Sequence, residues 1–336
     1  MAGTAMTREE RLDRFMARAN MIYYATHDPF ADFTTSPEIS QVFGEVIGIW
    51  AAVAWQMLGS PDPVLLAEAG PGRGTLMADA LRAVGRAAPG FAAALRVHLI
   101  ETSPRLRTAQ AARVPGAAWH DSLDSVPEAP MILLANEFLD ALPIRQFVRR
   151  GDGWTERFVA DGAWIEQPAD AAEVPPGRDA AEGQIVELNE PARAFAAALA
   201  GRLQRHPGAA LLVDYGPARS AAGDSLQALA RRKPIDPLSA AGSADLTAHV
   251  DFADIAQTAR SAGAAVQGPV TQGAFLSALG VFRRTEALAR GRTPPQAAAV
   301  RDGTHRLTGP AAMGDLFKVL AITSPGCGAL PGFAVG

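Results

Sequence analysis

Residues 65–76 read LLAEAGPGRGTL and bring one carboxylate together with three glycines. Glu68 lies near the end of an apolar run, and Gly70, Gly72 and Gly74 follow at alternate positions. A strand, a glycine-rich turn and a helix form the unit with which open α/β folds bind nucleotides, because glycines let the backbone approach the ligand closely. The stretch therefore predicts a nucleotide-type cofactor beside Glu68.

Two classes of cofactor use such a turn. Dinucleotide sites have the spacing G-x-G-x-x-G and an acid about 20 residues later for the ribose. Here the frame is E-x-G-x-G-x-G, Thr75 stands where the third dinucleotide glycine would be, and no acid occurs from residue 80 to residue 100. S-adenosylmethionine (SAM) has no pyrophosphate and needs no helix N-terminus aimed at an anion. The frame favours SAM over a nicotinamide cofactor, and a simple tight connection is the third interpretation.

Polar residues also end the next two apolar segments. Glu101 ends the segment LRVHLIE, where it can hold the ribose hydroxyls of a cofactor. Asp121 and Ser122 end the segment AWHDS, and in a SAM site an acid or hydroxyl here meets the adenine amino group. The alternative for Asp121 and Ser122 is a surface turn with a helix N-cap.

A charged cluster follows the most apolar segment, in LLANEFLDALP. Asn136, Glu137 and Asp140 come just past a predicted strand, at the sheet edge that also carries the glycine turn. Methyl transfer depends on positioning a nucleophile opposite the sulfur, and paired carboxylates can hold a charged guanidinium bidentately. Glu137 and Asp140 would share a face if the segment were helical. The alternative is that Asn136 caps a helix and both acids lie in its first turn.

The segments between these candidates predict the fold. Apolar runs alternate with helical patterns, which predicts a parallel sheet covered by helices on both faces. Strands are expected at 63–70, 95–101, 117–121, 130–138, 208–216 and 316–323, and helices at 74–87, 103–113, 190–205, 251–262, 271–290 and 294–302.

Residues 1–60 are expected to form a helical extension that closes over the cofactor. A short helix is predicted over 7–19, and Ser36 is predicted to cap a second helix that has Pro37 in its first turn and ends near Leu58. Residues 61–336 are expected to form one α/β domain with insertions around 144–205 and 217–310. The first insertion begins with a hairpin around Gly151–Gly153, and 166–183 and 217–250 are expected to be loops.

Composition excludes several classes of protein. The 336 residues are 48% apolar and carry a net charge of −4, which argues against a protein that coats nucleic acid. The single cysteine, Cys327, excludes an internal disulfide, and no His/Cys cluster indicates a metal site. The sequence has no run of about 18 apolar residues, so no membrane-spanning helix is predicted. These features predict a bacterial cytoplasmic protein.

Long segments of the chain resemble the MidA-like family of class I SAM-dependent methyltransferases. The resemblance implies a seven-stranded, mostly parallel, Rossmann-like sheet with extra helices and an inserted hairpin. It also implies methyl transfer from SAM to an arginine nitrogen of a protein, in the assembly of respiratory complex I. The matching segments are DFTTSPEISQVFGEVIGIW, LAEAGPGRGTLMADALR, IETSPRLRTAQ, ANEFLDALPIRQFV with GWTERFV, LLVDYG, DLTAHVDF and GPVTQGAFLSALG.

The resemblance also assigns site residues by position. Gly70, Gly72, Gly74 and Glu101 would bind SAM, Asp121 and Ser122 would lie by the adenine, Asn136 and Glu137 would lie near the reacting end, and the turn Thr35-Ser36-Pro37-Glu38 would close over the cofactor. Three alternatives stay open: a small-molecule methyltransferase, a SAM-binding assembly chaperone with little catalysis, and a nicotinamide oxidoreductase. The oligomeric state is open as well, with a homodimer as one option.

Overall fold

The computed structural model describes residues 9–27, 34–175, 180–230 and 233–333. It divides the chain into two compact units, and each unit is built from three chain segments. The sheet unit comprises Thr34–Leu139, Phe195–Ala218 and Asp251–Gly336. The hairpin unit comprises Met1–Phe33, Asp140–Ala194 and Arg219–Val250.

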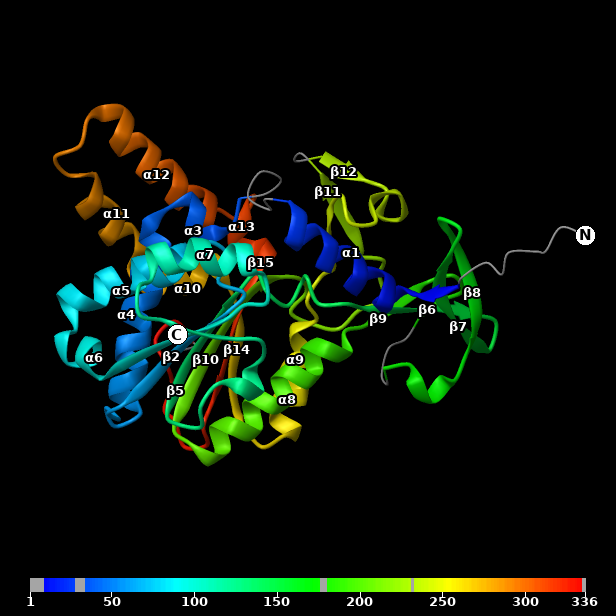
Figure 1. Cartoon of the computed structure of the whole chain (residues 1–336), viewed down its shortest axis with the longest axis horizontal. Coiled ribbons are helices and arrows are strands. Elements are labelled where there is room, and N and C mark those ends of the chain that lie inside the picture. Colours follow the sequence, from blue (N-terminus) through cyan, green and yellow to red (C-terminus); the bar gives the residue numbers. More distant parts are fainter. Residues whose placement is uncertain (1–8, 28–33, 176–179, 231–232, 334–336) are drawn as a thin grey trace, which may run out of the picture. The chain divides into compact units, whose positions relative to one another are not determined.

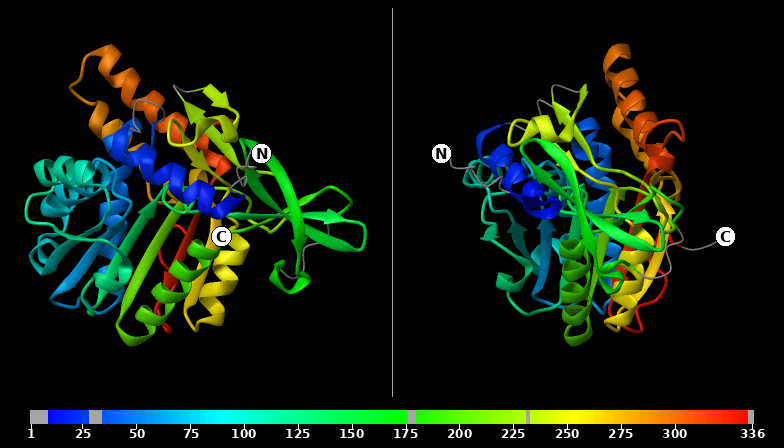
Figure 2. Two further views of the ribbon diagram at one scale, coloured as in Figure 1. Left: turned by 45° about the vertical axis from the view of Figure 1, so that its right-hand side comes forward. Right: turned by 90° about the vertical axis from the view of Figure 1, so that its right-hand side faces the viewer.

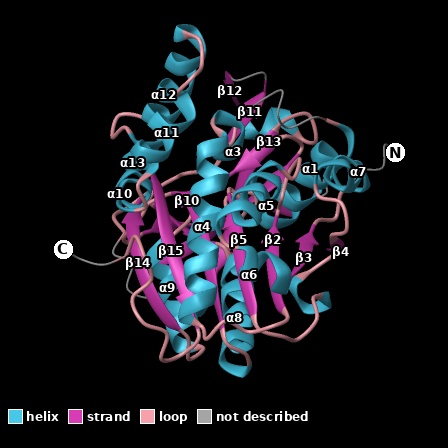
Figure 3. Ribbon diagram, turned by 90° about the vertical axis from the view of Figure 1, so that its left-hand side faces the viewer, coloured by secondary structure: helices cyan, strands magenta, loops and turns pink. Residues whose placement is uncertain are grey.

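A seven-stranded sheet forms the centre of the sheet unit (Figure 3). Strand β15 runs antiparallel to both of its neighbours, and all the other strands point the same way. The expected mostly parallel, Rossmann-like α/β sheet is therefore confirmed. In order across the sheet, the strands are β14 (Ala265–Thr271), β15 (Phe317–Thr323), β10 (Gly208–Tyr215), β5 (Met131–Asn136), β2 (Val64–Ala69), β3 (Leu95–Ile100) and β4 (Ala118–His120).

Helices cover both faces of this sheet, as Figure 1 shows with the strands between two groups of helices. One face carries α4 (Gln41–Met57), α5 (Thr75–Ala87) and α6 (Pro89–Ala94), and the other carries α9 (Phe252–Ser261) and the part of α8 (Glu190–Arg205) that belongs to this unit. Burial on both faces explains why β2 and β5 are apolar runs that are buried at every position.

Shorter helices complete the sheet unit. Helices α11 and α12 pack side by side (Figure 2). The bounds are α3 (Ser36–Ile39), α7 (Pro104–Arg113), α10 (Gln272–Ala278), α11 (Val281–Ala289), α12 (Pro294–Thr308) and α13 (Met313–Leu316).

The hairpin unit has its own sheets and its own core. Helix α1 (Leu12–Thr26) buries Leu12, Phe15 and Met16 in a cluster that includes Val159 and Leu246. One sheet has the order β1-β7-β6-β9 with β8 paired to β7, and the other has the order β12-β11-β13. Their bounds are β1 (Glu10–Arg11), β6 (Arg145–Arg150), β7 (Gly153–Ala160), β8 (Ala163–Ala169), β9 (Ile185–Leu188), β11 (Gln227–Ala230), β12 (Lys233–Ile235) and β13 (Asp245–Thr247).

Two predicted helices are interrupted. The helix expected from Ser36 to Leu58 breaks at Ser40, whose backbone is extended (φ −156°) and whose hydroxyl accepts a hydrogen bond from the Val42 amide at the start of α4. Thr35, not Ser36, occupies the N-cap position of α3. The helix expected over 271–290 ends at Leu279 because Gly280 is left-handed (φ 79°) and begins a new helix, α11.

Other differences are elements that lack a clear apolar pattern. The regions expected to be loops contain the second part of β8 and the three strands β11, β12 and β13, and β14 was not predicted. The first described helix runs over Leu12–Thr26, later than the predicted 7–19, and residues 7 and 8 lie outside the described part of the chain.

Candidate functional site

The glycine turn joins β2 to α5 in the sheet unit. Gly70, Gly72 and Gly74 have φ values of 63°, 53° and 78°, in the left-handed region that glycine adopts without strain. A Cβ atom on Gly70 would also lie 2.9 Å from the Phe138 ring. Backbone conformation therefore explains all three glycines, and any larger residue at Gly70 would close the turn against Phe138.

Glu68 lies directly before this turn and is almost completely buried, with 3% of its surface exposed. Its Oε2 atom has no hydrogen-bond partner among the described residues. Burial raises the pKa of Glu68 to about 8, although a hydrogen bond from the Met77 amide acts in the opposite direction. A buried carboxylate oxygen without a partner favours a cationic ligand group, so the residues present fit the ammonium end of SAM.

Glu101 follows β3 and is held from two sides. Its Oε1 accepts a hydrogen bond from the Ser103 amide (2.8 Å), and its Oε2 accepts one from Gln110 Nε2 (3.3 Å). Burial raises the pKa of Glu101, while these hydrogen bonds favour the ionised form. Gln110 is a candidate site residue that the sequence does not single out. Its only signal was a polar side chain four positions after the buried Leu106 on α7.

Asp121 and Ser122 directly follow β4, the neighbour of β3. The Asp121 side chain is 83% exposed and forms an ion pair with Arg107 (2.7 Å), whose Nε also donates to the Glu101 carbonyl. Ser122 forms a capping box with Ser125 at a short 3-10 helix, Leu123–Ser125. In this structure the Ser122 hydroxyl therefore caps the 3-10 helix. Asp121 is linked to Glu101 through Arg107, which contacts both residues.

Asn136 and Glu137 stand at the carboxyl end of β5. Glu137 has a left-handed backbone (φ 52°), which is strained for a residue with a side chain. Its Oε1 accepts hydrogen bonds from the Ser36 amide (2.8 Å) and from Asn136 Nδ2 (3.0 Å). Burial raises the pKa of Glu137. Asn136 Oδ1 is buried without a hydrogen-bond partner in the described part of the chain, so the cluster retains an unused acceptor.

No helix follows β5 directly. Residues 137–142 are not helical, so Asn136 does not cap a helix there and Glu137 and Asp140 do not share a helical face. The carboxylate of Asp214 instead fixes this loop, because its Oδ2 accepts hydrogen bonds from the amides of Phe138 (3.2 Å) and Leu139 (3.0 Å).

Asp140 is the first residue of the next segment of the hairpin unit. Its carbonyl accepts a hydrogen bond from the Ala248 amide (3.0 Å), and its carboxylate is buried. Tyr24 Oη donates to Asp245 (2.8 Å) in the same unit. Burial, followed by the charges of Asp245 and Asp140, raises the pKa of Tyr24. The structure therefore groups Asp140 with Tyr24 and Asp245.

The turn at residues 35–38 contacts both ends of the candidate site within the sheet unit. The Ser36 amide donates to Glu137, as described above, and Glu38 Oε1 accepts a hydrogen bond from Thr75 Oγ1 (2.5 Å) at the start of α5. Ser36 and Glu38 thus connect the end of β5 with the end of the glycine turn, and Thr35 and Pro37 belong to the same segment.

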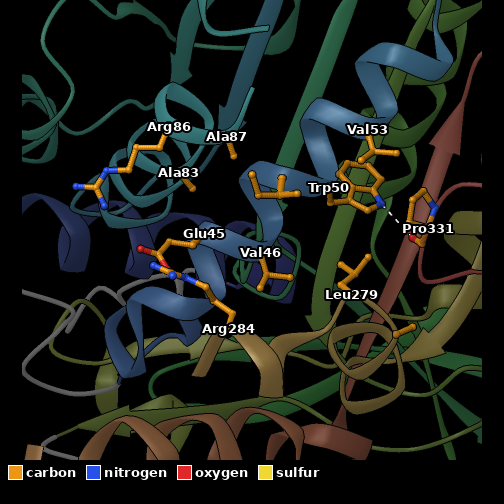
Figure 4. Close-up of a pocket in the computed structure, with 12 residues that line it drawn as sticks. Glu45, Val46, Trp50, Val53, Ala83, Arg86, Ala87, Leu279, Arg284 and Pro331 are labelled. Carbon is orange, nitrogen blue, oxygen red and sulfur yellow. Dashed lines mark hydrogen bonds and ion pairs between the residues drawn. The ribbon is translucent and has the colours of Figure 1, made fainter. Parts of the chain in front are cut away.

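A separate cavity of about 520 Å³ lies among helices α4, α5 and α11 (Figure 4). Its lining is mainly apolar, and Trp50 closes one side with its indole N–H donating to the Pro331 carbonyl (3.2 Å). Glu45, at the other side, pairs with Arg284 (2.6 Å). None of the predicted site residues lines this cavity, so it is distinct from the edge that carries Glu68, Glu101 and Glu137.

Comparison with known proteins bears on this site. The family described as "Putative S-adenosyl-L-methionine-dependent methyltransferase" matches residues 46–270. The chain belongs to this methyltransferase family. The match spans the glycine turn and the ends of β3 and β5, and it confirms the resemblance found in the sequence. The protein is therefore a SAM-dependent methyltransferase with SAM as cofactor, and the nicotinamide interpretation is excluded.

Two relatives and one solved structure are similar over most of the methyltransferase. Protein arginine methyltransferase NDUFAF7 homolog, mitochondrial, from Drosophila melanogaster is 35% identical over 89% of this chain and 77% of its own length. Protein arginine methyltransferase NDUFAF7, mitochondrial, from Homo sapiens is 32% identical over 89% and 76%. A crystal structure from Burkholderia thailandensis with bound S-adenosyl-homocysteine has a TM-score of 0.82 and 27% identity, covering 98% of this chain and 91% of that one.

Proposed function

We propose that this methyltransferase transfers the SAM methyl group to an arginine nitrogen of a protein. The fly and human relatives support this substrate, because both are named protein arginine methyltransferases. The observation that carries the proposal is the half-buried carboxylate of Glu137, held at the end of β5 beside the unpartnered Asn136 Oδ1. A guanidinium is cationic and offers several N–H donors, which matches this pair of acceptors.

We assign the cofactor to the edge of the sheet unit. Glu68 would hold the ammonium group, and the turn at Gly70, Gly72 and Gly74 would let the backbone approach. When bound, SAM supplies an electrophilic methyl carbon. In the same assignment Glu101 holds the ribose, Asp121 and Ser122 lie by the adenine, and Thr35, Ser36 and Pro37 close over the bound molecule.

The acidic residues would orient the guanidinium of the substrate and accept the proton that it loses. A guanidinium that gains a methyl group must lose one proton, because the product is again a monocation. Glu137 would localise the charge of the guanidinium and expose one nitrogen, and its raised pKa suits it to accept that proton. Asp140, three residues further along the chain, is proposed as a second carboxylate.

We further propose that the substrate is a subunit of respiratory complex I during its assembly, and that the protein acts in a bacterial cytoplasm. The family resemblance supports the substrate. Within the described ranges, no helix has the length and apolar character needed to cross a membrane.

The test is incubation of the protein with methyl-labelled SAM and lysate from a strain that lacks the gene. Label on one protein band, located on an arginine by mass spectrometry, is the expected result, and the Glu137→Gln variant should lose it. Label in the small-molecule fraction alone would instead support a small-molecule methyltransferase. Binding of SAM without any labelled product would support the assembly chaperone.

A further inference from the structure

We infer that Gln110 is a positioning residue for the cofactor, because one side-chain amide holds both the glycine turn and the carboxylate of Glu101. The inference rests on the proposed function, in which Glu101 binds the ribose hydroxyls. Gln110 lies in α7 and reaches the glycine turn and Glu101 with its side-chain amide. Its effect on SAM is therefore indirect, through the groups that it holds.

Three hydrogen bonds occupy both ends of the Gln110 amide. Nε2 donates to the Gly72 carbonyl (2.8 Å) and to Glu101 Oε2 (3.3 Å). Oε1 accepts a hydrogen bond from Trp119 Nε1 (2.9 Å). The residue is completely buried, so water does not compete for these bonds. A buried amide with both ends occupied has a fixed position.

Trp119 determines which way the amide faces. An indole N–H can only donate, so the Gln110 oxygen must point toward β4 and the two N–H groups must point toward Gly72 and Glu101. The reversed amide would place N–H against N–H at Trp119 and oxygen against oxygen at both other contacts. Trp119 thus selects the orientation that Gln110 needs.

The same amide sets the distance between two parts of the site. Glu101 is held by the Ser103 amide through one oxygen and by Gln110 through the other, which prevents rotation of the carboxylate. The Gly72 carbonyl is fixed by the same nitrogen, so the turn and the carboxylate cannot move apart independently. A nucleoside with free ribose hydroxyls would meet a carboxylate that is already oriented, which lowers the entropic cost of binding.

The experiment compares S-adenosyl-homocysteine with its 2′,3′-dideoxy analogue by calorimetry. Gln110→Met keeps the volume and removes the hydrogen bonds. We expect about tenfold weaker binding of S-adenosyl-homocysteine, the size of one hydrogen bond to a charged group, and less than threefold change for the dideoxy analogue. The kcat at saturating SAM should change less than twofold. Thr108→Ala, on the exposed side of α7, is the matched control and should change neither affinity.

Trp119→Phe gives a second and milder test that does not depend on the folding of the Gln110 variant. It should weaken binding in the same direction, and the double variant should be no weaker than Gln110→Met alone, because both changes act through one amide. If Gln110→Met binds S-adenosyl-homocysteine and its dideoxy analogue with the same ratio of affinities as the wild type, the role of Gln110 is overturned.

Glu101→Gln separates this inference from the proposed function. If Glu101→Gln loses the preference for ribose hydroxyls and Gln110→Met keeps it, only the role of Gln110 fails. If Glu101→Gln keeps the preference, the assignment of the ribose to Glu101 fails, and the inference fails with it.

Discussion

At the residue scale, Glu68 links the site to folding stability. A carboxyl group whose pKa rises on folding from 4.5 to about 8 binds its proton more tightly in the folded state. Its contribution is most favourable below about pH 4.5, and stability is lost as the pH rises from there through about 8. Glu68→Gln cannot ionise, so the melting temperature of the cofactor-free variant should fall less between pH 5 and pH 8 than that of the wild type.

Glu166 provides the control for this measurement. Its hydrogen bond with Arg150 lowers its pKa to about 2, so Glu166 is ionised in both folded and unfolded protein above pH 5. Glu166→Gln should therefore leave the slope of melting temperature against pH unchanged in this range. Parallel curves for the wild type and Glu68→Gln would show that the carboxyl does not keep its proton in the folded state.

Glu137 is the residue on which the proposed chemistry depends. Glu137→Gln retains an acceptor for the Ser36 amide but removes the charge that would localise the guanidinium. We expect kcat to fall by about 100-fold or more, as when one preorganised electrostatic contact is lost, while the Kd for SAM changes less than threefold. Steady-state kinetics with calorimetry measures both. Glu182→Gln, at an exposed position, is the matched control, and a kcat equal to the wild type would refute the role of Glu137.

The sequence singles out candidate site residues wherever strand ends bring them together. Glu68, Glu101 and Asn136 each stand at the carboxyl end of a parallel strand, and such ends share one edge of the sheet. Gln110 could not be found in this way, because it lies within α7 and its partners Gly72, Glu101 and Trp119 all lie outside that helix. The position of Asp140 follows from the left-handed backbone of Glu137. No local sequence pattern predicts that a glutamate adopts this conformation.

At the element scale, α4 and α5 pack more closely than side chains at most positions would allow. A Cβ atom on Gly48 would lie 2.6 Å from the Ala80 Cα and 2.7 Å from the Ala80 carbonyl oxygen, so the backbone of one helix would have to move. Gly48→Ala should reduce the free energy of unfolding by about 1–3 kcal/mol, the usual cost of overpacking. Urea denaturation measures this change.

Gly85 offers the same substitution without the clash. It lies in α5, and a Cβ atom there would meet nothing within 4 Å. Gly85→Ala should therefore raise the free energy of unfolding by about 0.5–1 kcal/mol, because alanine restricts the unfolded chain more than glycine does. If both variants were stabilised, the close packing of α4 on α5 would be disproved.

The elements that the sequence predicts well are those with a recognisable pattern of apolar residues. Strands β2, β5 and β10 were predicted to within two residues because burial on both faces makes them continuous apolar runs. Strand β14 has the sequence AVQGPVT and no fully buried residue, so it carries no such signal, and its place depends on pairing with β15. Strands β11 to β13 are three or four residues long, too short to show a period.

At the scale of the whole molecule, the two units have separate hydrophobic cores. The core of the hairpin unit joins α1 to Val159 and Leu246, whereas the core of the sheet unit surrounds the central strands. A ligand that binds one unit need not stabilise the other. Because we assign the cofactor to the sheet unit, S-adenosyl-homocysteine should slow unfolding of that unit selectively.

Native-state hydrogen exchange tests this expectation strand by strand. At a ligand concentration of 100 times Kd, binding adds about 2.7 kcal/mol, so amides that exchange only when the sheet unit unfolds should slow by about 100-fold. These amides lie in β2, β5 and β10. Amides in β7 and β8 should exchange at unchanged rates, because both strands belong to the hairpin unit, to which we do not assign the cofactor. Equal slowing in β7, β8 and β5 would mean that the two units unfold together and that the cofactor stabilises both.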